Sequence, residues 1–269
     1  MDLLIQTASQ GILIGGSYAL VALSLGLTYN VSGIINFAHG DFLTLSMFLA
    51  LAAQTAWLID PYISGVLLFP LLFVLGAGVY HFLLRPVAQS HLLMVIQLTL
   101  GISFVLQNGL LMLFGGQPAR VPSAFETTLF QIGDNFIFRA PQVFAFAGSV
   151  VLALALWLLL DHTEAGRRIR AVHQNPRAAA LMGINVPRLR MQIFGVGIGV
   201  QAIAGALILP GVPIDPALGF QYTVIPLMAL VMGGLTDFLG IYLGALLIGL
   251  TEALGTVFVS GTSGMMVPY

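Results

Sequence analysis

The stretch Asp161–Arg190, DHTEAGRRIRAVHQNPRAAALMGINVPRLR, decides how the rest of the chain is interpreted. It holds six of the nine basic residues of a chain that has no lysine, and the sequence on either side of it is mostly apolar. Basic segments between apolar runs are typical of cytoplasmic loops in membrane proteins. The pattern therefore predicts that the apolar runs lie in a membrane and that this segment lies in the cytoplasm, where a partner can dock.

The composition supports a membrane location. Hydrophobic residues make up 58% of the chain and charged residues 7%, whereas soluble domains are about 25% charged. Three long gaps contain no charged residue: Asp2 to Asp41, Arg85 to Arg120 and Arg190 to Asp215. Each gap can hold the roughly 20 apolar residues of a spanning helix. We expect an all-α polytopic membrane protein rather than a barrel, because the apolar runs are continuous and do not alternate.

Two missing residue types exclude some functions. The chain has no cysteine, which excludes thiol nucleophiles, disulfides and cysteine-ligated metals. A standard P-loop needs a lysine on the nucleotide phosphates, so a chain without lysine cannot form one. This chain therefore cannot hold a standard ATP site of that kind.

About eight apolar segments are expected, including broken or re-entrant ones. The segments are 11–29, 42–58, 62–84, 92–114, 143–160, 191–209, 223–232 and 240–259. The segment 223–232 is too short to span a membrane alone. The proline-rich connection Pro210–Pro216 before it is expected to be kinked and partly re-entrant.

The positive-inside rule gives the orientation. Arg85 and the basic segment follow the third and the fifth spans, so both fall on the same side, which the rule places in the cytoplasm. The N-terminus and the loop 116–140 are then expected outside. That loop contains two arginines and two acidic residues and has no positive bias.

Within the basic segment, a short helix is expected. Asn175 is a good N-cap, Pro176 suits the first helical position and Gly183 is a typical stop signal. The helix offers a small apolar face made of Ala178, Ala179, Leu181 and Met182. Two interpretations stay open: a loop that only orients the protein, or a helix that fits a socket on a cytosolic partner.

Four motifs resemble one transporter family. These are GIINFAHGDF at Gly33–Phe42, EAGRRIRAVHQNPRAAALMGIN at Glu164–Asn185, the segment Gly233–Leu235, and GALLIGLTEALG at Gly244–Gly255. They are similar to motifs in the permease subunits of Liv-type branched-chain amino acid ABC importers, and the similarity runs nearly end to end. The resemblance implies an ABC-importer permease fold, with residues 1–269 forming a single transmembrane domain.

The resemblance also implies a role for the basic segment, 161–190. In that family the corresponding loop is the coupling segment that sits in a groove of the ATPase subunit. The positions that match are Glu164, Gly166, Arg167, Arg170, Asn175, Ala179 and Gly183. Family members usually continue into one more apolar helix with a basic tail, so the resemblance predicts a further helix beyond residue 269.

A second group of polar residues interrupts the apolar sequence at Asn36, His39, Gly40 and Asp41. Polar groups at membrane depth are costly and often functional, and broken helices expose ends that bind substrates or ions. We therefore expect a gate or part of a translocation pathway here. The alternative is that Asn36 and Asp41 cap the second helix while His39 and Gly40 shape the turn. No metal site is expected, because no second ligand has a suitable spacing.

Three further residues are candidates for the pathway: Gly233, Gly234 and Glu252. The two glycines break an apolar run. Glu252 is an acidic residue inside the last apolar segment, where it could line a pathway or pair with a neighbouring chain. A simple hydrogen bond between helices is the alternative for Glu252.

The leading hypothesis is the membrane subunit of an ATP-driven importer of branched-chain or related hydrophobic amino acids in the bacterial inner membrane. The resemblance implies a second homologous permease subunit, two cytosolic ATPase subunits that bind ATP, and an extracytoplasmic solute-binding protein. No catalytic residue, cofactor or nucleic-acid partner is expected in this chain.

Other functions were weighed. A permease for urea or short amides within the same family is the runner-up, because the His39-Gly40-Asp41 motif does not distinguish these substrates. A secondary transporter would need intramembrane ionisable residues, and only Glu252 and Asp41 qualify. An intramembrane enzyme is disfavoured because the five histidines are scattered.

Overall fold

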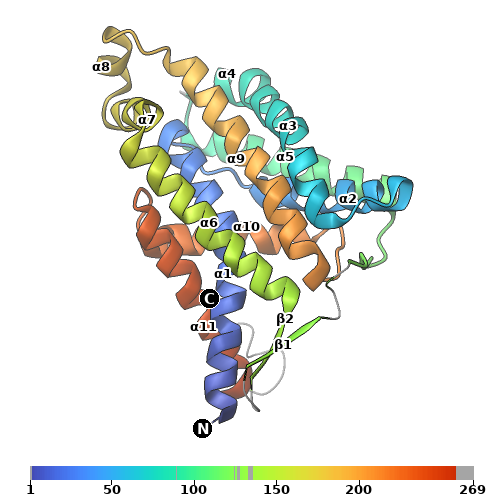
Figure 1. Ribbon diagram of the computed structural model, residues 1–269. Coiled ribbons are helices and arrows are strands. Elements are labelled where there is room, and N and C mark those ends of the chain that lie inside the picture. Colours follow the sequence, from blue (N-terminus) through green and yellow to red (C-terminus); the bar gives the residue numbers. More distant parts are fainter. Residues whose placement is uncertain (1, 89, 124, 126–127, 133–135, 259–269) are drawn as a thin grey trace.

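The computed structural model describes residues 2–88, 90–123, 125, 128–132 and 136–258 (Figure 1). The longer helices are α1 Asp2–Ser32, α2 His39–Trp57, α3 Pro61–Val79, α5 Leu92–Phe114, α6 Ala140–His162, α9 Val186–Ile208, α10 Leu218–Gly233 and α11 Phe238–Phe258. The shorter elements are η1 Tyr80–Leu84, α4 Arg85–Val87, β1 Leu129–Ile132, β2 Phe136–Arg139, α7 Glu164–Gln174, α8 Pro176–Leu181 and η2 Leu209–Gly211.

Six helices in the described part of the chain are long and apolar enough to cross a membrane. They are Leu4–Ser32, Pro61–Val87, Leu92–Phe114, Ala140–His162, Val186–Gly211 and Phe238–Val257. This confirms the predicted polytopic helical class, and α10 adds a shorter apolar helix. The expected total of eight segments stays a prediction.

The predicted loop 116–140 contains structure that the sequence analysis did not anticipate. Strands β1 and β2 pair antiparallel, with Leu129 opposite Arg139. The acidic residues Glu126 and Asp134 of this loop lie outside the described residues. The hairpin therefore adds a small β element to an otherwise helical protein.

Helices α1 and α9 form the centre of the bundle. Their membrane-length windows are 78% and 83% buried, against 17–22% for α3, α5 and α6. Helix α11 packs closely along α1, where a Cβ on Gly249 would lie 2.3 Å from the backbone nitrogen of Gly15. Small residues at such a crossing let two helix backbones approach each other. The outer helices keep exposed apolar side chains, which suits contact with lipid.

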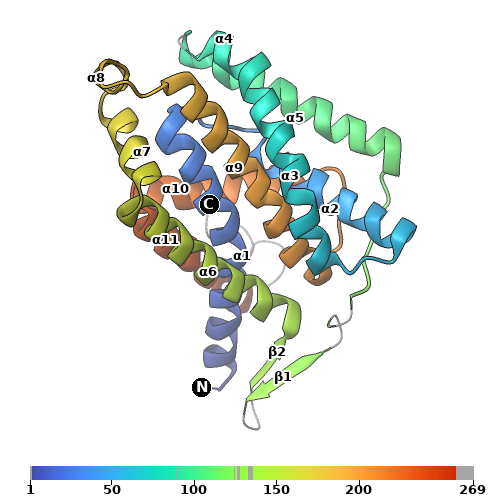
Figure 2. The ribbon, with the colours of Figure 1, turned by 45° about the horizontal axis from the view of Figure 1, so that its top comes forward.

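The basic elements gather at one end of the bundle. Helices α4, α7 and α8 lie at the end opposite the N-terminus and the β1–β2 hairpin (Figures 1 and 2). The sequence predicts that Arg85 and the basic segment lie on one side, and the positions of α4, α7 and α8 agree with that prediction (Figure 1). Which end faces the cytoplasm stays a prediction.

Two helices begin inside the bundle. His39, the first residue of α2, contacts Ser24, which is eight residues before the end of α1. At 1.5 Å per residue, α2 therefore starts about 12 Å along α1 from its end at Ser32. Helix α10 starts at Leu218, and its next residue, Gly219, lies against Asp41 of α2.

The connection into α10 pairs with the loop that follows α5. After η2, the backbone amide of Ile214 donates to the Ala119 carbonyl at 2.8 Å, and Ala119 donates back at 2.9 Å. Helix α10 begins at Leu218 rather than at Thr223, and it continues through Pro226. The chain thus returns into the bundle before α10 starts.

Candidate functional site

Helix α7 is fixed to the end of α6 by a capped turn. Thr163 is its N-cap, and the Thr163 hydroxyl accepts a hydrogen bond from the Gly166 amide at 3.1 Å. A Cβ on Gly166 would lie only 2.1 Å from the Leu160 carbonyl oxygen. A glycine is therefore needed at this contact. Ile169 and Val172 continue the buried side of α7.

Helix α8 is the short capped helix that the sequence predicts. The Asn175 side-chain oxygen accepts hydrogen bonds from the amides of Arg177 and Ala178 at 3.1 and 3.0 Å. Gly183 ends the turn with a φ of +86°, a conformation that favours glycine. These contacts explain why a helix this short is well defined.

The two faces of α8 differ sharply. Ala179 is 4% exposed and faces the protein, whereas Leu181 and Met182 are 89% and 84% exposed. The pair Leu181 and Met182 is called the α8 tip below. Because Ala179 is covered by the chain itself, the apolar side chains that can contact a partner are those of the α8 tip, together with Ala178 and Ala180.

The charged residues of α7 divide into two groups. Glu164 forms ion pairs with Arg167 at 3.5 Å and Arg168 at 3.7 Å on the exposed side. Arg170 instead forms an ion pair with Asp161 at 3.1 Å and donates to the Leu160 carbonyl, which holds α7 against α6. Exposed ion pairs contribute little to stability. Arg167 is therefore free to serve a partner surface in a way that Arg170 is not.

Two hydrogen bonds join the basic end to the end of α1. His173 Nδ1 lies 2.7 Å from the Asn30 carbonyl oxygen, and this nitrogen must carry the proton because a carbonyl only accepts. Arg190 Nε donates to the Val31 carbonyl at 3.0 Å. Only a short segment connects the end of α1 to the buried start of α2. A displacement of α7 that moves the end of α1 would therefore also move the start of α2.

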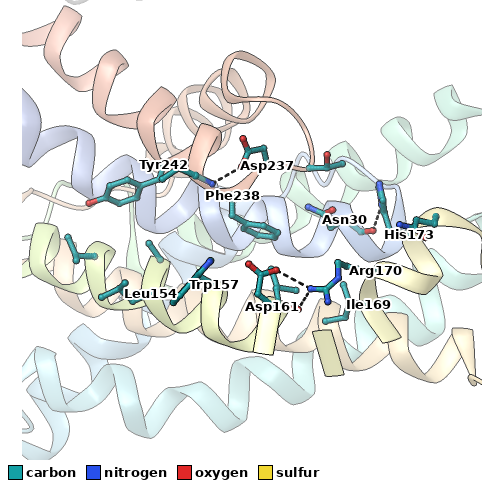
Figure 3. Close-up of a pocket in the computed structure, with 16 residues that line it drawn as sticks. Asn30, Leu154, Trp157, Asp161, Ile169, Arg170, His173, Asp237, Phe238 and Tyr242 are labelled. Atoms are coloured by element: carbon teal, nitrogen blue, oxygen red, sulfur yellow. Dashed lines mark hydrogen bonds and ion pairs between the residues drawn. The ribbon is translucent and has the colours of Figure 1, made fainter. Parts of the chain in front are cut away.

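A cleft of about 870 Å³ lies beside the basic end (Figure 3). Its polar part contains Asp161, Arg170 and His173, and its apolar part contains Trp157 and Phe238. Helices α6, α7 and α11 and the end of α1 supply its walls. Because residues of the α10–α11 turn and of α7 both line the cleft, the turn and α7 lie close to each other.

The start of α2 carries a buried polar network. The side chain of His39 is completely buried, and its Nε2 lies 2.9 Å from Ser24 Oγ of α1. Gln201 of α9 donates from its amide nitrogen to Ser24 Oγ at 2.7 Å and also contacts His39 Nε2. The predicted gate residue His39 therefore joins α1, α2 and α9.

Asp41 and Gly40 face a different pair of helices. Asp41 Oδ1 accepts a hydrogen bond from Gln107 Nε2 of α5 at 2.9 Å, and the Gly40 amide donates to Thr223 Oγ1 of α10 at 2.9 Å. A Cβ on Gly40 would lie 2.1 Å from the Gly219 carbonyl oxygen. The starts of α2 and α10 therefore meet in direct backbone contact.

The capping alternative for these residues is wrong in its main part. The N-cap of α2 is Ala38, and no side chain caps this helix. Asn36 Oδ1 does accept from the Ala38 amide at 3.1 Å, so Asn36 shapes the turn before α2. Asp41 instead bonds across to α5. Its position reflects contacts between helices and not the local geometry of a helix start.

Sequence reasoning missed the partners of this network: Ser24, Gln107, Gln201 and Thr223. Two of them are glutamines inside long apolar runs, which is a usable signal because buried amides in a membrane need partners. Neither glutamine was among the polar residues that the sequence predicted to be functional.

The remaining pathway candidates fall in two separate places. Gly233 lies where α10 meets α11, since a Cβ there would be 2.2 Å from the Gly240 carbonyl oxygen, and Gly234 has a φ of +92°. Both glycines shape the α10–α11 turn beside the basic end. Glu252 lies further along α11, where its Oε2 accepts a hydrogen bond from the Tyr18 hydroxyl at 2.8 Å.

Comparison with known proteins places the chain in a family. A family described as "branched-chain amino acid transport system / permease component" matches residues 7–268. The high-affinity branched-chain amino acid transport system permease protein LivH of Escherichia coli (strain K12) is 28% identical, covering 95% of this chain and 87% of that protein. No solved structure matches the chain.

Two further relatives extend the similarity across distant organisms. The permease protein BraD of Pseudomonas aeruginosa is 25% identical over 93% of this chain and 86% of its own length. The probable LivH of Methanocaldococcus jannaschii is 30% identical over 91% of this chain and 79% of its own length. With a family match that covers nearly the whole chain, this protein belongs to the permease components of branched-chain amino acid transport systems.

Proposed function

We propose that this chain is the membrane-spanning subunit of an ATP-driven ABC importer that carries branched-chain or related hydrophobic amino acids across the bacterial inner membrane. The names of its relatives support this substrate class. The absence of lysine from the sequence supports ATP binding by separate subunits, because a P-loop needs that residue.

The partners follow from the same proposal. The chain pairs with a second homologous permease subunit, two cytosolic ATPase subunits bind at the basic end, and an extracytoplasmic binding protein delivers the substrate. The α8 tip offers exposed apolar side chains to an ATPase groove, and the neighbouring helix α7 carries exposed arginines such as Arg167. Aromatic, methionine and arginine side chains are enriched at such interfaces.

One observation carries the coupling mechanism: the basic end is hydrogen-bonded to the end of α1, and the next residues enter the buried start of α2. When the ATPases close, they would move α8 and α7, and the movement would pass through Asn30 and Val31 to α2. Helix α2 contacts α1, α5, α9 and α10 through His39, Gly40 and Asp41. It is therefore placed to change the packing of the bundle between inward-open and outward-open states.

Uptake into cells that express this chain with its partner subunits tests the proposal. Radiolabelled leucine, isoleucine and valine should accumulate in an ATP-dependent manner, and labelled urea should not. Accumulation of urea without any of the amino acids would favour the alternative of an amide permease. Accumulation driven by an ion gradient without ATP would favour a secondary transporter.

A further inference from the structure

A cavity of about 400 Å³ lies in the half of the bundle nearer to the β1–β2 hairpin. Its walls come from the outer parts of α1 and α6, the connection that follows η2, the start of α10 and the middle of α11. Cavities of this size suit small molecules. One of its two acidic residues is Glu252, whose function the sequence left open between a pathway and a structural hydrogen bond.

The surroundings of Glu252 suit a positively charged group. Its carboxylate accepts from the Tyr18 hydroxyl, and the rings of Tyr18 and Tyr222 lie 6.0 Å apart at 60°. Tyrosine faces attract cations, and a carboxylate pairs with an ammonium group. The residues described as lining the cavity include two carboxylates and no arginine. The second carboxylate, Asp215, accepts from the Ala217 amide at 2.8 Å and so stabilises its own turn.

The rest of the cavity suits the other parts of an amino acid. Ile14, Ile208, Val212 and Leu218 supply apolar walls that can receive a branched aliphatic side chain. Gln142, in the first turn of α6, adds an amide side chain, and this helix begins without a side-chain cap. The Gln142 side-chain amide can donate a hydrogen bond to a carboxylate, whereas the Ala140 amide of this turn already donates to the Thr128 carbonyl and Pro141 has no N–H.

A neighbouring cavity near the hairpin carries positive charges. It is lined by Arg120 and Arg139 and shares the wall residues Pro141, Gly211 and Val212 with the Glu252 cavity. Of the two adjoining cavities, one is lined by two arginines and the other by the Glu252 carboxylate. A zwitterion that passes from the first cavity to the second meets groups that attract its carboxylate and then a group that attracts its ammonium.

We propose that Glu252, with Tyr18 and Tyr222, forms the subsite that binds the α-ammonium group of an amino acid during its passage through this subunit. The inference rests on the proposed function and adds to it a criterion for which solutes bind. A solute must carry a primary ammonium group to occupy the cavity, so neutral amides such as urea and simple carboxylic acids bind poorly. The carboxylate of the substrate points towards the start of α6.

The variant Glu252→Gln removes the charge while its amide oxygen can still accept the Tyr18 hydrogen bond. We expect the complex with its partner subunits to assemble normally. The rate of leucine uptake into proteoliposomes should fall about tenfold, which corresponds to ~1.4 kcal/mol of lost stabilisation. A purely structural hydrogen bond would leave uptake unchanged in this variant.

Binding without transport gives a second readout, measured as the melting temperature of the purified complex. Leucine and leucinamide both carry the ammonium group and should raise the melting temperature of the wild type, whereas 4-methylpentanoate, which lacks it, should not. Glu252→Gln should abolish both increases. The matched control is Asp60→Asn, which removes a carboxylate from the N-cap of α3 and keeps the cap, and it should behave as the wild type.

The outcomes separate this inference from the proposed function. If the wild-type complex imports no leucine, the proposed function itself fails. If it imports leucine and Glu252→Gln imports leucine equally well, only the ammonium subsite is wrong. Stabilisation of the wild type by 4-methylpentanoate as strong as that by leucinamide would also overturn the subsite.

Discussion

At the scale of single residues, the closest contact at the proposed gate is between two glycines. A Cβ on Gly40 of α2 would lie 2.1 Å from the Gly219 carbonyl oxygen of α10. A Cβ on Gly219 would lie 2.3 Å from Asp41 Oδ1 of α2. The Thr223 hydroxyl and the Gly40 amide form a hydrogen bond across the same contact. The absence of side chains thus lets the starts of two broken helices touch inside the bundle.

The variant Gly40→Ala should therefore force α2 and α10 apart. Inserting a methyl group into a packed site typically costs ~1–3 kcal/mol, and backbone atoms cannot move aside as a flexible side chain can. We expect a lower melting temperature of the purified complex and a loss of substrate uptake. Gly78→Ala in α3 is the control, because a Cβ there meets nothing within 4 Å and alanine favours a helix. Equal stability of the two variants would contradict the contact.

The sequence could predict that Asn36, His39 and Asp41 matter, because polar side chains in an apolar run are costly unless they have partners. It could not predict those partners. Gln107 is 66 residues from Asp41, and Gln201 is 162 residues from His39. Their pairing depends on how the helices pack, and the packing cannot be deduced from a single sequence. Local turn chemistry was therefore the only available alternative, and it assigned Asp41 to the wrong partner.

At the scale of elements, α8 is the part of the fold that the sequence predicts best. Asn175 and Pro176 start the helix and Gly183 ends it through contacts with residues close by in the sequence. These contacts do not depend on the rest of the bundle. Which side of α8 faces the protein could not be predicted from the sequence. Ala179 turns inward and the α8 tip outward because of the contact with α7 and α9, which only the folded chain determines.

The α8 tip gives a test of ATPase docking. Leu181→Glu places a charge where an apolar side chain would enter a socket, and Leu181 is too exposed for the change to disturb folding. We expect co-purification of the ATPase subunits to fall by about tenfold or more, since ~1.4 kcal/mol of lost binding already gives that factor. Pro187→Glu is the control, because it adds the same charge to an exposed position at the start of α9. Undiminished co-purification with Leu181→Glu would show that docking does not use this tip.

Arginine reversals at this end require separate interpretations. Arg167→Glu changes an exposed position whose partner within the chain is Glu164, so its effect reports on a partner surface. Arg170→Glu also breaks the contacts with Asp161 and the Leu160 carbonyl that fix α7 to α6. A loss of ATPase binding in the Arg170 variant alone would therefore reflect a displaced α7.

At the scale of the whole molecule, the charge distribution divides the bundle into two ends. Arg85 in α4 and the arginines of the basic segment lie at the end that carries α7 and α8, while Arg120 and Arg139 lie at the hairpin end (Figure 1). The sequence predicts this division correctly, since counting spans needs only the lengths of apolar runs. It also predicts breaks before α2 and α10, but it does not reveal that the starts of these two helices meet each other inside the bundle.

The positive-inside rule then assigns the end with α7 and α8 to the cytoplasm, and accessibility of single cysteines tests this orientation. The natural chain has no cysteine, so each single substitution reports one position. In intact cells, a membrane-impermeant maleimide should label Gln117→Cys in the loop after α5 and should not label Met182→Cys at the α8 tip. In inside-out vesicles the pattern should reverse. Both positions are exposed, so a missing signal reflects the membrane barrier and not burial within the protein. Labelling of Met182→Cys in intact cells would place the α8 tip outside and would remove the structural basis for ATPase docking, whatever the uptake assays show.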